Sequence, residues 1–544
     1  MTILINRRGL ILTGSFGIGA LAMGGTLHAE ALLTARGFTH NVASGEPGPD
    51  SILLWTRYVP PNGDDAKLTV ELSPTPDFAR KTGGSAMAHR ADDYTARVIV
   101  GGLEPGRTYY YRFIAPDGTV SPTGRTRTLP VGPVERFGLG VFSCANLPNG
   151  WFNAYAHAAA RDDIDLMVHV GDYIYEYQRG YFPGADKAVA GRLIEPVGEA
   201  IRLADYRLRY ASYRTDPDLQ RLHQLFPMIV QHDDHETAND TWQHGAENHQ
   251  SGEGDFEERK RASMKAWKEW LPVSGAPWSS FELGDLATLF RPETRLTARS
   301  ERLDPQAAVG VDGDPVAKLK ALRDGPLADP KRTLLGTEQE HWLYDGFARS
   351  RQRGAKWQIV AQQVVMGEMK IPELPASFAE NLKLPPEQAS YFRGISAAGK
   401  VGISPDLDSW AGFPAARKRL LDAAQATDAD LVVLSGDSHN GWAFDLASQG
   451  KPAGVEFGGH SVSSPGLEAY LSLPPQAIAQ FVMSASPELK WADIGHRGYM
   501  AIQITPEKVT GEWVFMDTIA TRSLATRTGK TMTVERGRRT FAQA

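Results

Sequence analysis

Five short apolar runs constrain the fold of this chain more than any other feature of its sequence. They are residues 137–142, 166–170, 227–230, 358–361 and 431–434. Each run is too short for a helix, and longer polar or amphipathic stretches separate the runs. Such alternation is typical of α/β proteins with buried strands. The sequence therefore predicts an α/β domain over residues 132–544.

Polar and ionisable residues directly follow these runs. Cys144 follows the first run, Asp172 the second, the Asp-Asp-His-Glu cluster 233–236 the third, and Asp437 and His439 the last. Ligands of open α/β sheets bind at the carboxyl ends of the strands, so we expect these side chains to converge. Buried carboxylates need a cation or another partner. This edge of the predicted sheets is therefore the candidate site.

Residues 32–131 show a different pattern, with short alternating runs at 51–56, 68–72 and 96–100 between turn residues. Strands at this spacing predict an antiparallel β-sandwich. The segment 102–113 resembles the tyrosine corner of fibronectin type III domains. Acids and histidines do not cluster here, so we interpret this domain as a scaffold or substrate-positioning unit, with carbohydrate or surface binding as the alternative.

Residues 1–31 have the features of an export signal. Arg7 and Arg8 precede an apolar, glycine-rich run over 9–27, and 29–31 form a small-x-small cleavage pattern. This predicts a cleaved twin-arginine signal peptide, hence the export machinery as a partner and a periplasmic or secreted location. An uncleaved membrane anchor is the alternative. No later stretch is apolar enough to span a bilayer, so no stable membrane span is expected after cleavage.

Charge and cysteine content exclude further classes. The formal net charge is -6, which offers no basic footprint for a stoichiometric nucleic-acid partner, although small phosphoester substrates remain possible. Cys144 is the single cysteine, so the chain forms no internal disulfide.

The hexapeptide 171–176 (Gly-Asp-Tyr-Ile-Tyr-Glu) is the most informative motif. Asp172 can bridge two cations, and Tyr175 can supply a phenolate ligand to a hard trivalent ion. Alone, it reads equally well as a turn aspartate with interface tyrosines. The clusters 233–236 and 436–439 follow it in the order found in binuclear metallophosphoesterases, which favours the metal interpretation.

These motifs resemble the PhoD-type alkaline phosphatase and phosphodiesterase family over essentially the whole mature chain. The resemblance is carried by 41–47, 142–144, 171–176, 233–236 with Asn239, Trp410 and 436–439. It implies a four-layer α/β/β/α metallophosphoesterase domain after a fibronectin III-like β-sandwich. It also implies Fe3+ and Ca2+ as cofactors.

By that resemblance, Cys144, Asp172 and Tyr175 hold the ferric ion, Asp172 bridges, and Asp234, Asn239 and Asp437 serve calcium. A lone cysteine at a strand end is more often a buried hydrophobe. Its place beside the cluster favours a thiolate ligand stabilised by a cation. Catalytic nucleophile is a third interpretation, which no Cys/His/Asn signature supports.

The expected activity is hydrolysis of phosphate mono- and diesters by metal-activated water, for phosphate scavenging. His235 or His439 would protonate or position the leaving oxygen. The family commonly has tryptophan where this chain has His232, and an Asp where it has Glu293. Arg295 is predicted either to clamp a phosphate or to form a salt bridge. A phospholipase D-like diesterase and a secreted binding protein with a structural metal are the alternative functions.

Overall fold

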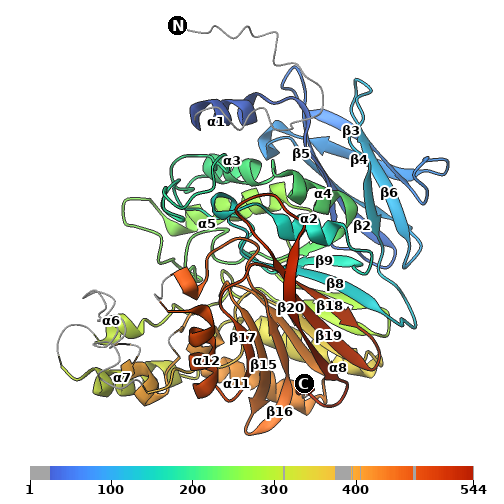
Figure 1. The fold of residues 1–544 in the computed structure, drawn as a ribbon. Coiled ribbons are helices and arrows are strands. Elements are labelled where there is room, and N and C mark those ends of the chain that lie inside the picture. Colours follow the sequence, from blue (N-terminus) through green and yellow to red (C-terminus); the bar gives the residue numbers. More distant parts are fainter. Residues whose placement is uncertain are drawn as a thin grey trace.

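The computed structural model describes residues 25–309, 313–373, 394, 396–404, 406–469 and 473–542. Within them, two large sheets stack face to face (Figure 1). The nine-stranded sheet has the order β20-β19-β18-β8-β9-β10-β1-β2-β5. Its strands are β1 (Gly37–Gly45), β2 (Ser51–Val59), β5 (Thr95–Gly101), β8 (Phe137–Phe142), β9 (Leu166–His169), β10 (Pro227–Val230), β18 (Gly498–Ile504), β19 (Lys508–Met516) and β20 (Thr526–Glu535).

The second sheet has seven strands among the described residues, in the order β11-β12-β13-β14-β16-β15-β17. They are β11 (Ser279–Leu283), β12 (Ala287–Arg291), β13 (Trp357–Ala361), β14 (Leu431–Ser435), β15 (Gly441–Ser448), β16 (Lys451–Gly458) and β17 (Leu489–Asp493).

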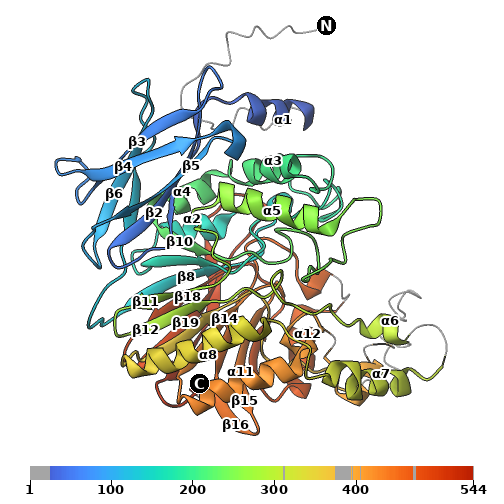
Figure 2. The same ribbon diagram turned by 180° about the vertical axis from the view of Figure 1, so that it is seen from behind.

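Helices cover the outer face of each sheet, as Figures 1 and 2 show. The first sheet carries α2 (Asn153–Ala159), α3 (Leu203–Tyr213), α4 (Pro217–Leu225) and α5 (Phe256–Trp270), and the second carries α8 (Gly336–Gln352), α11 (Pro414–Ala426) and α12 (Pro475–Ala485). Short helices α6 (Pro305–Val309) and α7 (Pro315–Asp324) lie on an outer insertion. The predicted α/β/β/α sandwich is confirmed.

Side chains along the predicted strands alternate between two covered faces of the sheet, which explains why these strands are mainly apolar. Leu139 and Val141 of β8 face the core between the two sheets, whereas Phe142 packs under the outer helices. In β14, Val432 faces the core between the two sheets and Val433 packs under the outer helices. Because both faces are covered, most positions are apolar, and the buried polar side chains of His169 and Gln358 are hydrogen-bonded to Tyr155 and Ser350. The predicted runs coincide with β8, β9, β10, β13 and β14, and their ends differ by no more than one residue.

Parallel pairing sets the position of the site. β8 pairs with β9 and β9 with β10, all in parallel, and β12, β13 and β14 form a second parallel set. The carboxyl ends within each set therefore lie at one edge.

The front unit is sheet-rich, as predicted. Strands β3 (Ala66–Ser73), β4 (Thr82–Ala88), β6 (Thr108–Ile114) and β7 (Gly124–Arg127) form a four-stranded sheet. The tyrosine corner is present, because the backbone N–H of Glu104 donates to the Tyr109 hydroxyl at 2.9 Å. Strand β1 also pairs in parallel with β10, which joins the front unit to the nine-stranded sheet. We propose a division at residues 131/132, in the connection between β7 and β8.

The predicted signal peptide lies mostly outside the described residues. Residues 1–24 are not described, and helix α1 (Gly25–Thr34) extends across the predicted cleavage point. Among the helices that the structure describes, none is long and apolar enough to cross a membrane.

Candidate metal centre

Backbone strain marks the loops that follow β8, β9 and β14. Cys144, Asp172, Asp437 and His439 have φ values of 58°, 53°, 63° and 62°. Residues other than glycine rarely adopt this left-handed conformation, which costs on the order of 1 kcal/mol and clusters at functional sites. These loops are therefore candidates for a functional site.

Two glycines let these loops approach one another. A Cβ atom on Gly171 would lie 2.4 Å from Cβ of Asp233, and one on Gly436 would lie 2.5 Å from Cβ of Ser143. Neither position has room for a side chain. The second contact is between the two stacked sheets, since Gly436 follows β14 and Ser143 follows β8. The glycines therefore close the sheets onto a single centre.

Three overlapping groups of side chains at this centre have the geometry of cation ligands. Their potential ligand atoms lie within 4.8 Å of one another in each group. The groups are Cys144, Asp172 and His439; Asp172, Asp234 and His235; and Asp233, Asp234 and Asp437. Asp172 joins the first group to the second, and Asp234 joins the second to the third. The arrangement is that of a chain of adjacent cation sites with shared carboxylates.

Tyr175 closes one side of the centre. Its phenolic oxygen lies 2.9 Å from Oδ2 of Asp172 and 3.1 Å from Nε2 of His439. The hydroxyl of Ser464 donates to the same oxygen at 2.7 Å. His439 is held from behind, with its Nδ1 2.7 Å from the carbonyl oxygen of Pro465. Nε2 of His439 is thereby directed at the centre.

His235 is oriented by a buried carboxylate. Its Nδ1 lies 2.7 Å from Oε2 of Glu176. The other oxygen of Glu176 accepts hydrogen bonds from the backbone N–H of Asn239 and the side chain of Asn248, both at 2.8 Å. Burial opposes protonation of His235, but the charges of Asp234 and Glu176 raise its pKa well above the ordinary value.

Arg295 is completely buried among carboxylates. Its guanidinium pairs with Asp437 at 2.9 Å and Asp234 at 3.4 Å, and it also binds Asp233 and Asp408. Asp234 belongs to the second and third ligand groups, and Asp233 and Asp437 belong to the third. Arg295 therefore supplies part of the positive charge that these acids need.

Family comparisons agree with this geometry. Residues 139–513 match the family model described as PhoD-like phosphatase, and residues 25–130 match that of the PhoD-like phosphatase N-terminal domain. The chain is also 31% identical, over 506 residues, to alkaline phosphatase D of Bacillus subtilis (strain 168), which covers 88% of this chain and 77% of that protein. The chain belongs to the PhoD-like phosphatase family. It is therefore a phosphoesterase, as predicted.

Solved structures agree with the fold of this PhoD-like phosphatase. A structure titled "Structure of PhoD" has a TM-score of 0.74 and 27% identity, and covers 94% of this chain and 92% of that one. The purple acid phosphatase PPD1 from yellow lupin (Lupinus luteus) seeds has a TM-score of 0.56 at 14% identity, covering 92% and 74%. The second likeness concerns the fold alone.

The donor set of this PhoD-like phosphatase fits metal ions. Oδ1 of Asp172, Oδ2 of Asp233 and Oδ1 of Asp234 are buried and have no hydrogen-bond partner among the described residues. A carboxylate oxygen only accepts, so a buried one without a donor calls for a cation. The thiol, phenol and imidazole on one side suit a transition metal, whereas the carboxylates on the other suit a hard cation.

The pKa values of Cys144 and Tyr175 also fit a metal ion at this centre. Burial, with the nearby Asp172 carboxylate, raises the pKa of the Cys144 thiol and of the Tyr175 phenol well above their ordinary values. Both groups are therefore protonated without a cation, and both become anionic ligands only beside one. Burial also raises the pKa of Asp437.

The structure places the sequence-predicted residues as follows. Cys144, Asp172, Asp234, Asp437, His235 and His439 belong to the three groups, and Tyr175 touches two members of the first. Asn239 lies outside these groups, and its side chain donates to Glu247 at 3.0 Å. A calcium ligand at Asn239 and a phosphate clamp at Arg295 stay predictions.

Three acids of the site were missed as functional residues. Asp233 is a member of the third group, although the motif alone assigned it no role. The Glu236 carboxylate accepts the backbone N–H groups of Asp172 at 3.1 Å and Asp233 at 2.6 Å, which ties two site loops together. Asp408 reaches the site through Arg295. No local pattern marks Asp408, whereas Asp233 and Glu236 lie inside the recognised motif.

Proposed function

We propose that this PhoD-like phosphatase is an exported, metal-dependent alkaline phosphatase and phosphodiesterase that hydrolyses small phosphate mono- and diesters for phosphate scavenging. The observation that carries the metal dependence is the chain of three ligand groups with two buried carboxylate oxygens, Oδ1 of Asp172 and Oδ2 of Asp233, that have no partner among the described residues. When bound, adjacent cations supply neutralisation of the phosphoryl oxygens and activation of water.

Fe3+ and Ca2+ are the proposed ions. Cys144, Asp172 and Tyr175 would hold the iron, because thiolate and phenolate donors suit it. Asp234, Asn239 and Asp437 would hold calcium, which prefers oxygen ligands. Asp172 and Asp234 each belong to two groups, so each would serve two ions.

His235 and His439 are the proposed proton carriers. Each ring has one nitrogen held from behind, by Glu176 in His235 and by the carbonyl of Pro465 in His439. The second nitrogen of each ring faces the centre, that of His439 at 3.1 Å from the Tyr175 hydroxyl, and would position or protonate the leaving oxygen there. Buried Arg295 would keep the carboxylates in place and add positive charge beside the phosphate.

Export by the twin-arginine route is part of the proposal. Its support is the Arg7-Arg8 pair and the apolar run that follows. Folding before export would let the centre be loaded in the cell, and the single cysteine is consistent with a fold that needs no disulfide.

Kinetics of Asp172→Asn test this function. We expect the wild-type protein, supplied with iron and calcium, to hydrolyse p-nitrophenyl phosphate and bis-p-nitrophenyl phosphate. The variant should lose this activity, since it lacks a carboxylate shared by two groups, and should remain folded by circular dichroism. If the loaded wild-type protein hydrolyses neither ester, and the variant changes only stability, the site is structural and the proposal fails.

A further inference from the structure

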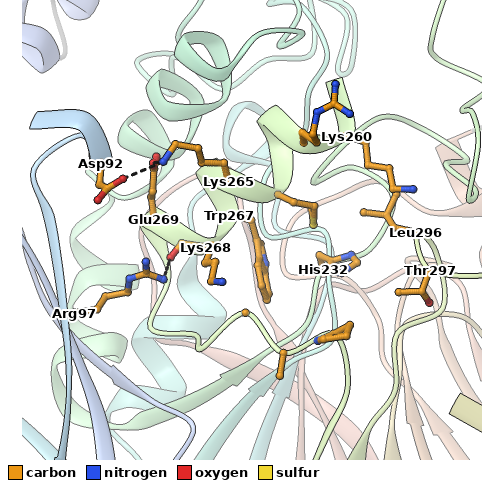
Figure 3. Close-up of a pocket in the computed structure, with 15 residues that line it drawn as sticks. Asp92, Arg97, His232, Lys260, Lys265, Trp267, Lys268, Glu269, Leu296 and Thr297 are labelled. Atoms are coloured by element: carbon orange, nitrogen blue, oxygen red, sulfur yellow. Dashed lines mark hydrogen bonds and ion pairs between the residues drawn. The ribbon is translucent and has the colours of Figure 1, made fainter. Parts of the chain in front are cut away.

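A cavity lies between helix α5 and strand β5 of the front unit (Figure 3). Its volume is about 500 Å³. Helix α5 contributes residues between Lys260 and Glu269 to its lining, and Gly275–Pro277, Leu296 and Thr297 also line it. Its size is within the range of small-molecule sites.

Cationic side chains dominate the lining of this cavity. They are Arg97, Lys260, Arg261, Lys265 and Lys268, against the two carboxylates Asp92 and Glu269. Both carboxylates are already engaged, since Lys265 binds Asp92 at 2.9 Å and Glu269 at 2.7 Å. Arg261 and Lys268 form no ion pair with any acid that the structure describes. The cavity is thus a local excess of positive charge on a chain of net charge -6.

The lining also contains two buried ring nitrogens that have no hydrogen-bond partner among the described residues. His232 and Trp267 are 5% and 4% exposed, and their rings pack edge to face with their centroids 5.3 Å apart. Nδ1 of His232 and Nε1 of Trp267 have no hydrogen-bond partner within the described ranges. The indole N–H only donates, so it requires an acceptor. Buried groups left in this state call for a bound water, ion or ligand.

The cavity shares two segments with the metal centre. His232 immediately precedes Asp233, and its carbonyl oxygen accepts a hydrogen bond from Gln363 at 2.6 Å. Leu296 and Thr297 follow Arg295, and the backbone N–H groups of both donate to Glu293 at 2.8 Å. A ligand in the cavity would therefore contact the segments that position Asp233 and Arg295.

From these contacts we infer that the cavity is a second anion site, which takes a phosphate group distinct from the one at the metal centre. Arg261 and Lys268 supply the charge, and His232 and Trp267 lie at the buried end as hydrogen-bonding groups. The phosphate has two possible sources: a second phosphate of the same substrate, or free inorganic phosphate. The inference rests on the proposed function only for the first source.

The test removes the two unpaired charges with the double variant Arg261→Gln and Lys268→Gln. A matched control, Lys67→Gln with Arg80→Gln, removes the same charge from exposed positions on and near the four-stranded sheet, outside the cavity. One arm compares KM for bis-p-nitrophenyl phosphate with KM for the p-nitrophenyl 5′-phosphodiester of thymidine 3′-phosphate, which carries a second phosphate. The other arm measures the thermal shift caused by inorganic phosphate.

If the substrate supplies the phosphate, the cavity variant raises KM for the two-phosphate substrate about tenfold and leaves KM for the other ester within about twofold. If free phosphate is the ligand, the variant loses about 2 °C of the thermal shift that the control keeps. Either result supports the site. Identical behaviour of the two double variants in both arms overturns it. A protein that hydrolyses neither ester but shows the thermal-shift difference would refute the proposed function and leave the anion site standing.

Discussion

The phenolic oxygen of Tyr175 and Oδ2 of Asp172 lie 2.9 Å apart, and each of the two residues is only 1% exposed. Only two residues separate them in sequence, and the left-handed backbone at Asp172 turns the chain so that both side chains meet. This contact places a phenol against the carboxylate that two ligand groups share. It makes Tyr175 the residue whose chemistry reports most directly on the ion at Asp172.

Tyr175→Phe is expected to lower kcat/KM about 10- to 100-fold and to abolish the visible absorption of a ferric phenolate. The fold should survive, because the ring keeps its packing against Phe182 and His235. Steady-state kinetics measure kcat/KM, and visible spectra of the iron-loaded proteins measure the absorption band. Tyr177→Phe is the control, since Tyr177 also packs against His235, but its hydroxyl, unlike that of Tyr175, makes no hydrogen bond to Asp172 or His439. An unchanged spectrum in Tyr175→Phe would contradict the assignment.

Cys144→Ser is expected to lose iron and hydrolysis while the sandwich stays folded. Serine preserves the size of the side chain but replaces a soft thiolate by a poor anionic ligand. Elemental analysis beside an esterase assay measures both losses. Full activity with full iron content would show that Cys144 only packs in the core.

Arg295→Gln is expected to destabilise the metal-free protein by about 3–5 kcal/mol, because four carboxylates lose their shared buried cation. Added calcium should recover part of this loss. Denaturant unfolding with and without chelator measures the change. Arg302→Gln removes a partly exposed pair with Asp240 and should cost no more than about 1 kcal/mol. Equal losses in the two variants would rule out a special role for Arg295.

Acid is expected to destabilise the fold through His460. Burial lowers the pKa of this imidazole to about 4 in the folded chain, against the ordinary value of 6.5. The unfolded chain binds the proton first, so this contribution is present above pH 6.5 and is lost as the pH falls toward 4. By pH 5 the stability lost in this way amounts to about 2 kcal/mol.

The variant His460→Gln tests that contribution. Unfolding of wild type and variant at pH 7 and pH 5 should show a smaller pH-dependent loss in the variant. His244→Gln, at an exposed histidine, serves as the control and should keep the wild-type dependence. A variant that loses as much stability as wild type between the two pH values would refute the role of His460.

Sequence reasoning succeeded where local pattern determines structure. Apolar runs buried on both faces predicted β8, β10 and β14, and parallel pairing then brought the residues after them together. It failed where packing joins distant segments. Arg295 meets Asp233 and Asp408, which are 62 and 113 residues away, and no spacing rule links them. The pairing of β1 with β10 was missed for the same reason.

The His232 position shows a second limit. The family commonly has tryptophan at the position before the cluster 233–236, where this chain has His232. The structure shows a buried ring against Trp267 that lines a separate cavity. That outcome depends on α5 and on the segment after Arg295, both remote in sequence.

Reconstitution tests the central claim, a metal-dependent phosphoesterase at the Asp172 centre, most directly. The protein is stripped with chelator, shown by elemental analysis to lack metals, and assayed with bis-p-nitrophenyl phosphate after addition of single ions and of pairs. We expect the stripped protein to show no hydrolysis, and we expect hydrolysis to recover when Fe3+ and Ca2+ are added together. Full hydrolysis by the metal-free protein would contradict metal dependence, and full recovery with zinc alone would contradict the iron and calcium assignment.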